Sequence, residues 1–226
     1  MNSTGMAAGA ATVSSLQEYL SRLYALETTF RVDDFLLTDE TVARELEGED
    51  FRAVEEKLLV AEDDGDLRLS LYLEPGMLQR LEAARPLESL QRAELQDFWA
   101  VLEGVSHFTY LTFKAQQDRG VRPVELELQA EVDKFVVTAL LGSAQHTPAS
   151  SRDLHHWLFE LSQPDPALDE DLRRRYVHAG RNAARYCHSL MRRFPDVSPA
   201  LLPELRHFYR LDHPGKLRFI DTSVAG

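Results

Sequence analysis

Apolar residues recur at helical spacing along most of this chain. Between Ser15 and Glu27 they return every three or four positions, and a serine stands where it can cap the first turn. A shorter helix is predicted from Glu40 to Leu46, capped by Thr38 or Asp39. The residues before the first helix are small, polar and rich in Gly and Ala. We therefore expect a disordered tail over residues 1–13.

The clearest strand pattern lies between Glu55 and Pro75. Leucines occupy every second position from 67 to 73, and the sequence Asp-Asp-Gly-Asp at 63–66 supplies turn residues between two apolar runs. The pattern predicts a β-hairpin of residues 56–62 and 67–73, with residues 30–37 as a candidate third strand. Because a lone hairpin is marginal in water, it must pack on helices or add a further strand.

Beyond Pro75 the pattern is helical to the end of the chain. After a short helix that should stop before Pro86, longer helices are predicted over residues 92–118, 124–141, from near 151, and 168–194, with one or two short ones to follow. The fold class is therefore mainly α (α+β), with a small N-terminal hairpin unit packed on a bundle of about four to five longer helices. We see no linker and expect a single domain over residues 14–222, made of an α+β unit at 14–74 and a helical bundle at 75–222.

Composition narrows the class of protein. The chain has 226 residues, of which 44% are hydrophobic, enough to bury one substantial core. No apolar run approaches the roughly 20 residues that cross a bilayer, and the N-terminus does not resemble a secretory signal. The single cysteine, Cys187, allows neither an internal disulfide nor a paired-thiolate zinc site. These features, with the scarcity of lysine, predict a cytoplasmic protein of a GC-rich bacterium, without membrane binding.

Charge is distributed unevenly along the sequence. The net charge of −12 argues against general affinity for nucleic acid or anionic membranes. Residues 33–66 hold 14 acidic residues against three basic ones, whereas residues 173–218 hold 11 basic residues against three acidic ones. This asymmetry suggests that oppositely charged surfaces take part in recognition.

The helix predicted over 168–194 has two distinct faces. Its apolar face includes Cys187, which we therefore expect to be buried and unreactive. The opposite face carries Arg174, His178, Arg181, Arg185, His188 and Arg192. We take Arg174, His178, Arg181, Arg185 and Arg192 as candidate partner-binding or anion-binding residues. Two other interpretations stay open: an ordinary solvated face, and an internal partnership with the acidic N-terminal unit.

A second group of polar residues spans two predicted helices. Glu103 and His107 lie one turn apart, and Glu127, Glu131 and Lys134 form a polar stripe on the next helix. Helical bundles build metal sites from carboxylates and histidines on facing helices, although the spacing here does not match the di-iron pattern. The alternative is that Glu103 supports His107 on a wetted face and that Lys134 pairs with Glu127 or Glu131.

Two further features favour structural interpretations. Gly104 costs helix stability, and with Ala100 on the same side it predicts the close crossing of a neighbouring helix. The adjacent histidines at 155 and 156 diverge on a helix and lack the spacing of a metal pair, so Trp157 beside them is more simply a core or groove residue.

The sequence contains no recognisable nucleotide-binding, hydrolase or RNA-binding motif. We therefore expect a non-catalytic interaction or accessory protein that uses no cofactor and binds a protein partner through the basic helix face or the acidic N-terminal surface. The alternative function is an enzyme, or a bundle that binds a metal or small molecule, using Glu103, His107, Glu127 and Glu131. Nucleic-acid binding through the basic helix ranks third, because the global charge opposes it.

Overall fold

The computed structural model describes residues 3–48, 54–63, 66–147, 150–161, 170–195 and 200–225. The protein is mainly α-helical with a small β-sheet, as the sequence predicted. The chain divides into two compact units: Met1–Arg22 with Glu27–Phe113, and Leu23–Leu26 with Lys114–Gly226. The sequence placed an internal division at residues 74 and 75, whereas the structure places it at Phe113 and Lys114. The single domain over 14–222 stays a prediction.

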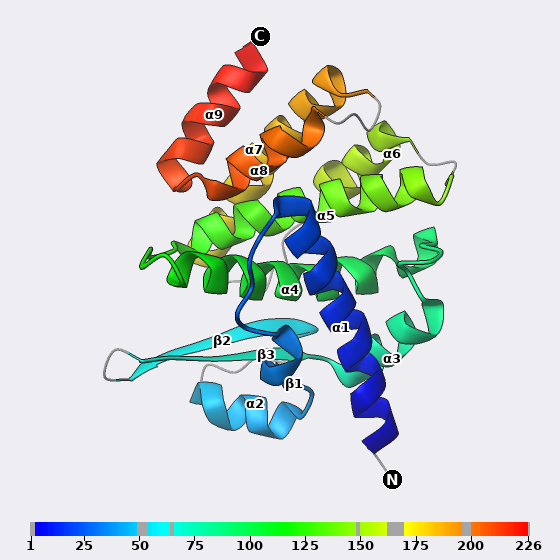
Figure 1. Cartoon of the computed structure of the whole chain (residues 1–226), viewed down its shortest axis with the longest axis vertical. Coiled ribbons are helices and arrows are strands. Elements are labelled where there is room, and N and C mark those ends of the chain that lie inside the picture. The colour runs from blue at the N-terminus through cyan, green and yellow to red at the C-terminus, as the bar shows by residue number, and fades with distance from the viewer. Residues whose placement is uncertain are drawn as a thin grey trace. The chain divides into compact units, whose positions relative to one another are not determined.

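The elements of the first unit follow the predicted order, and Figure 1 shows them from blue to green. They are α1 (Ser3–Tyr24), a 3-10 turn (Val32–Phe35), β1 (Leu36–Leu37), α2 (Glu40–Glu47), β2 (Glu56–Asp63), β3 (Asp66–Leu73), α3 (Pro75–Ala84) and α4 (Leu95–Ala115). Helix α1 begins at Ser3, inside the segment 1–13 for which we expected a disordered tail. Alanine has the highest helix propensity, and four alanines between residues 7 and 11 favour extending the helix toward the N-terminus.

The sheet has the strand order β1-β3-β2. Strands β2 and β3 form the predicted antiparallel hairpin, in register from Glu56 opposite Leu73 to Asp63 opposite Asp66. The candidate third strand is reduced to Leu36 and Leu37, which pair in parallel with β3, because residues 32–35 form the 3-10 turn. The short β1 still covers one edge of β3, which places β3 at the centre of the sheet.

Helix α4 packs across one face of this sheet, and α2 lies on the other side (Figure 1). The apolar side chains of α4 are fully buried over Phe98, Val101, Leu102, Val105 and Phe108. Leu71 and Leu73 of β3 are buried as well, and both lie beside Gly104. The core of the first unit therefore runs between the hairpin and α4, and this packing positions the candidate site.

The second unit consists of α5 (Pro123–Ala144), α6 (Ser151–His156) with a π-helical turn (Trp157–Leu161), α7 (Glu170–Arg193), α8 (Leu201–Arg210) and α9 (His213–Ala225). Helix α7 packs against α5, α6 and α9. Ser150 caps α6 through a hydrogen bond from the backbone N–H of Asp153. Among the residues that the structure describes, no helix has both the length and the apolar character required to span a bilayer.

Candidate metal centre

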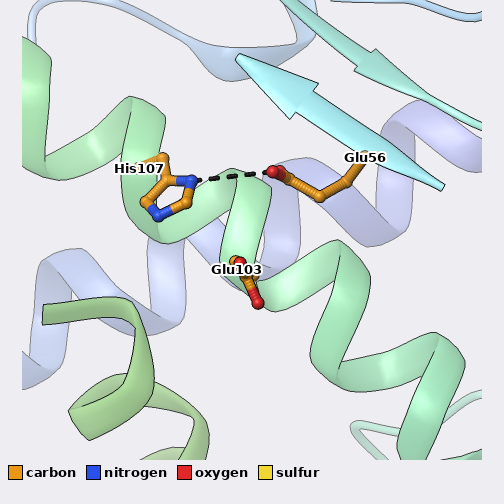
Figure 2. Close-up of side chains that lie close together, drawn as sticks. All are labelled: Glu56, Glu103 and His107. Carbon is orange, nitrogen blue, oxygen red and sulfur yellow. Dashed lines mark ion pairs between the residues drawn. The ribbon is translucent and has the colours of Figure 1, made fainter. Parts of the chain in front are cut away.

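Three side chains of the first unit converge between strand β2 and helix α4. Glu56 is the first residue of β2, and Glu103 and His107 lie one turn apart on α4. Figure 2 shows the imidazole of His107 directed toward the Glu56 carboxylate, with Glu103 on the same helix nearby. One ligand atom from each side chain lies within 4.8 Å of the other two.

The site is largely shielded from solvent. The side chain of His107 is 7% exposed and that of Glu56 is 16% exposed, and their Nδ1 and Oε1 atoms are 3.6 Å apart. This ion pair orients the histidine ring toward the hairpin. The surrounding residues Leu71, Leu73 and Phe108 are apolar and fully buried. In such surroundings, water screens charges poorly, which strengthens any interaction between the carboxylates and a cation.

Gly104 makes the close approach of β2 possible. A Cβ atom at this position would contact the Glu56 carboxylate and would lie 2.8 Å from Cδ1 of Leu71 and 3.4 Å from Cδ2 of Leu73. The sequence predicted that a neighbouring helix crosses α4 here, and this detail is wrong, because within the first unit the element against Gly104 is the β-hairpin. Whether a helix or a hairpin packs against Gly104, the absence of a side chain lets the two backbones approach closely.

The ligand set defines the chemistry that the site can perform. A histidine nitrogen and two carboxylate oxygens suit divalent first-row ions such as Mn²⁺, Fe²⁺, Co²⁺ and Zn²⁺, whereas Ca²⁺ and Mg²⁺ favour oxygen ligands alone. Ligand bonds of about 2.0–2.2 Å bring donor atoms to roughly 3–4 Å from one another. Side-chain adjustments of about 1 Å would therefore close the three ligands around an ion.

No family model, curated protein or solved structure matches this chain. The geometry of the site is therefore the basis for its chemistry.

Only part of this site was visible in the sequence. Glu103 and His107 were predicted as candidate ligands, and the interpretation that places them on a wetted face fails for His107, which is buried. The companions expected for them, Glu127 and Glu131, belong to the second unit, where Glu131 forms an ion pair of 2.7 Å with Lys134. Glu56 was missed, because nothing in its strand pattern distinguishes a carboxylate that faces α4 from one in solvent.

The basic face of α7 is exposed along its length. The partner-binding candidates Arg174, His178, Arg181, Arg185 and Arg192 are all exposed, and so is His188. Two of these arginines form ion pairs within the second unit: Arg174 with Glu170 and Asp171 of α7, and Arg185 with Asp221 of α9. Exposed pairs of this kind contribute little to stability.

Cys187 lies on the opposite face of α7 and is fully buried. Burial raises the pKa of its thiol well above the usual range, and the nearby Glu131 and Asp133 carboxylates raise it further. The thiolate needed for nucleophilic or redox chemistry is therefore disfavoured, in agreement with a structural role.

Proposed function

We propose that this protein binds a divalent first-row transition-metal ion through Glu56, Glu103 and His107. The observation that carries the proposal is the convergence of one histidine nitrogen and two carboxylate oxygens within 4.8 Å. Two carboxylates held this close repel each other when both are ionised, and a cation bound between them relieves that repulsion. The many acidic residues of segment 33–66, which contains Glu56, add a field that attracts cations.

Three protein ligands leave coordination positions for water or a small ligand, as in catalytic rather than structural zinc sites. The proposal thus develops the alternative function that the sequence raised for Glu103 and His107, with Glu56 as the third ligand. The proposal covers metal binding only, and catalysis at the bound ion is not part of it.

Calorimetric titration of metal-free protein with Mn²⁺, Co²⁺ and Zn²⁺ tests the proposal. We expect one ion per chain, with preference over Ca²⁺, and visible absorption bands for Co²⁺ coordinated by nitrogen and oxygen. The variants Glu103→Gln and His107→Gln should weaken binding more than about tenfold, since even residues that only support metal ligands have effects of 10–100-fold.

The protein contains a matched control for these variants. His156 and Glu160 form an exposed histidine–glutamate pair at the same spacing, with Nδ1 and Oε2 2.8 Å apart, on α6 and the π-helical turn that follows it. The variants His156→Gln and Glu160→Gln should leave metal affinity unchanged. Affinity that depends equally on both pairs would indicate surface adsorption, and the proposal would then be wrong.

We propose as a second candidate that the exposed basic face of α7 docks an acidic protein partner. Its support is that five candidate side chains, spaced along one face of α7, are all exposed. Reversing Arg181 and Arg185 to glutamate should weaken the complex recovered in a pull-down at low salt. Reversing the exposed Arg44 and Arg92 of the first unit changes the net charge equally and should not. Equal recovery with both double variants, or no partner at all, would remove this candidate.

A further inference from the structure

The second unit buries an extended group of charged and polar side chains that the metal site does not use. Lys216 of α9 is 0% exposed. Its Nζ donates a hydrogen bond to Oε1 of Gln129 in α5 and lies 4.7 Å from the centre of the Phe208 ring in α8. An amide oxygen accepts this hydrogen bond whether the lysine is charged or neutral, so the contact by itself does not require an ammonium ion.

The amide of Gln129 connects Lys216 to a buried carboxylate. Its Nε2 donates to Oδ1 of Asp133 over 2.8 Å, and the hydroxyl of Tyr24 donates to the same oxygen. Asp133 therefore accepts two hydrogen bonds, from Gln129 and Tyr24, in addition to any attraction from a charged Lys216. The Gln129 amide therefore lies between Lys216 and Asp133 in this chain of hydrogen bonds.

Lys114, at the end of α4, is also deeply buried, and its surroundings differ. Its Nζ lies 3.7 Å from a carboxylate oxygen of Glu125 and donates to the backbone oxygen of Leu211 over 2.8 Å. A carboxylate and a carbonyl both favour the charged form, although burial lowers the pKa of Lys114. This lysine faces the segment that leads into α9.

His213 lies one helical turn before Lys216, at the start of α9. It is 8% exposed, and its buried Nδ1 has no hydrogen-bond partner among the residues that the structure describes. Its ring centre is 6.2 Å from that of His178 in α7. Burial lowers the pKa of His213, since a charged imidazolium would lose its hydration at this position.

The charged groups that act on Lys216 lie on α4 and α5. Burial, the largest effect, lowers the pKa of Lys216 to about 7, and Lys114 lowers it further. The carboxylates of Glu125 and Asp133 in α5 act in the opposite direction. Other titratable side chains of this group are His213, Tyr209 of α8, whose ring lies near Lys216, and Tyr24 of α1, which bonds to Asp133. Burial raises the pKa of both tyrosines well above the usual range, so they stay neutral.

We propose that α9 is an acid-sensitive latch: it stays docked while Lys216 and His213 occupy the interior uncharged, and it loosens when they take up protons. The geometry supports this because both bases lie on one turn of α9 and are buried there. The other contacts of α9 include apolar packing around the buried Ile220 and ring contacts of Phe219 with Tyr186 of α7 and Phe208 of α8. An exposed ion pair between Arg185 and Asp221 also joins α9 to α7.

The direction of the effect follows from proton linkage. An undocked Lys216 has its ordinary pKa of 10.5, and the docked side chain has a pKa of about 7. Between these values the undocked state binds more protons, so lowering the pH favours undocking by up to about tenfold per unit, with no further effect of Lys216 below pH 7. His213 adds a change of the same sign below its ordinary value of 6.5.

Hydrogen exchange of the full chain, measured by mass spectrometry at about pH 7, 8 and 9 and corrected for intrinsic rates, tests the latch. The opening equilibrium of α9 should rise close to tenfold for each pH unit lowered. In Lys216→Met the dependence should largely disappear, and the helix should be protected even at pH 7. The control Lys57→Met removes a lysine of β2 in the first unit and should keep the wild-type dependence.

Exchange of α9 that is independent of pH, or a pH dependence that persists in Lys216→Met, would overturn the proposal. If that variant does not fold, the wild-type protein with isotope-labelled lysine gives the answer by NMR, because the chain has only four lysines to assign. One lysine should titrate near pH 7. Four lysines that all titrate above pH 9 would exclude an uncharged Lys216 and the latch with it.

Discussion

At the scale of single residues, Gly104 shows how a missing side chain shapes the candidate site. The sequence indicated that a glycine inside a helix must have a packing reason, and that inference holds. It could not tell whether a helix or a hairpin approaches, because both require the same absence of a Cβ atom. The same limit applies to Glu56, whose identity as a glutamate does not reveal that it faces His107.

We predict that Gly104→Ala destabilises the protein and weakens metal binding. The new methyl group would collide with Leu71 and with the Glu56 carboxylate, and overpacking of this kind costs about 1–3 kcal/mol. The better helix propensity of alanine offsets only about 1 kcal/mol of that cost. Urea unfolding and metal titration measure the two effects.

Gly180 of α7 provides the control, because a Cβ atom there would meet nothing within 4 Å. Gly180→Ala should raise the free energy of unfolding by up to about 1 kcal/mol. A stabilised Gly104→Ala variant would show that the hairpin does not approach α4 as closely as the structure indicates.

At the scale of elements, helix periodicity predicted most boundaries to within a few residues but not which polar stripe of α5 is buried. The sequence drew attention to Glu127, Glu131 and Lys134. In the structure, Glu125, Gln129 and Asp133 are buried and lie one turn from each other. Glu125 and Gln129 meet lysines from other elements, and Asp133 accepts a hydrogen bond from Tyr24. One stripe combines acidic and basic residues and the other combines acidic and amide residues, both at helical spacing. Periodicity therefore could not show which stripe is buried.

We predict that Asp133→Asn lowers the free energy of unfolding by about 1.5–3 kcal/mol, the range for hydrogen bonds to a charged group. The substitution preserves shape but removes the charge that receives hydrogen bonds from Tyr24 and Gln129. Denaturant unfolding at pH 7 measures the change.

Glu127→Gln removes the same charge from a half-buried position on the same helix and should change stability by less than about 0.5 kcal/mol. Equal effects of the two substitutions would mean that net charge, rather than the buried network, determines the response.

At the scale of the whole molecule, the two units are not successive stretches of sequence. The four residues Leu23–Leu26 belong to the second unit, although the residues on both sides of them belong to the first. Tyr24 stacks on Tyr209 with ring centres 4.0 Å apart, and the guanidinium of Arg210 donates to the backbone oxygens of Tyr24 and Ala25. A division at residues 74 and 75, chosen from the change in pattern, could not anticipate this exchange.

By itself, the sequence determined the mainly helical class, the hairpin, the exposed basic face of α7 and the burial of Cys187. All of these follow from periodicity, turn residues and hydrophobicity within a short stretch of chain. Tertiary structure decided that Glu56 joins Glu103 and His107, that a hairpin lies against Gly104, and that Lys216 and His213 enter the interior. Each of these depends on contacts between residues distant in sequence, whose chemistry is compatible with either burial or exposure until the chain has folded.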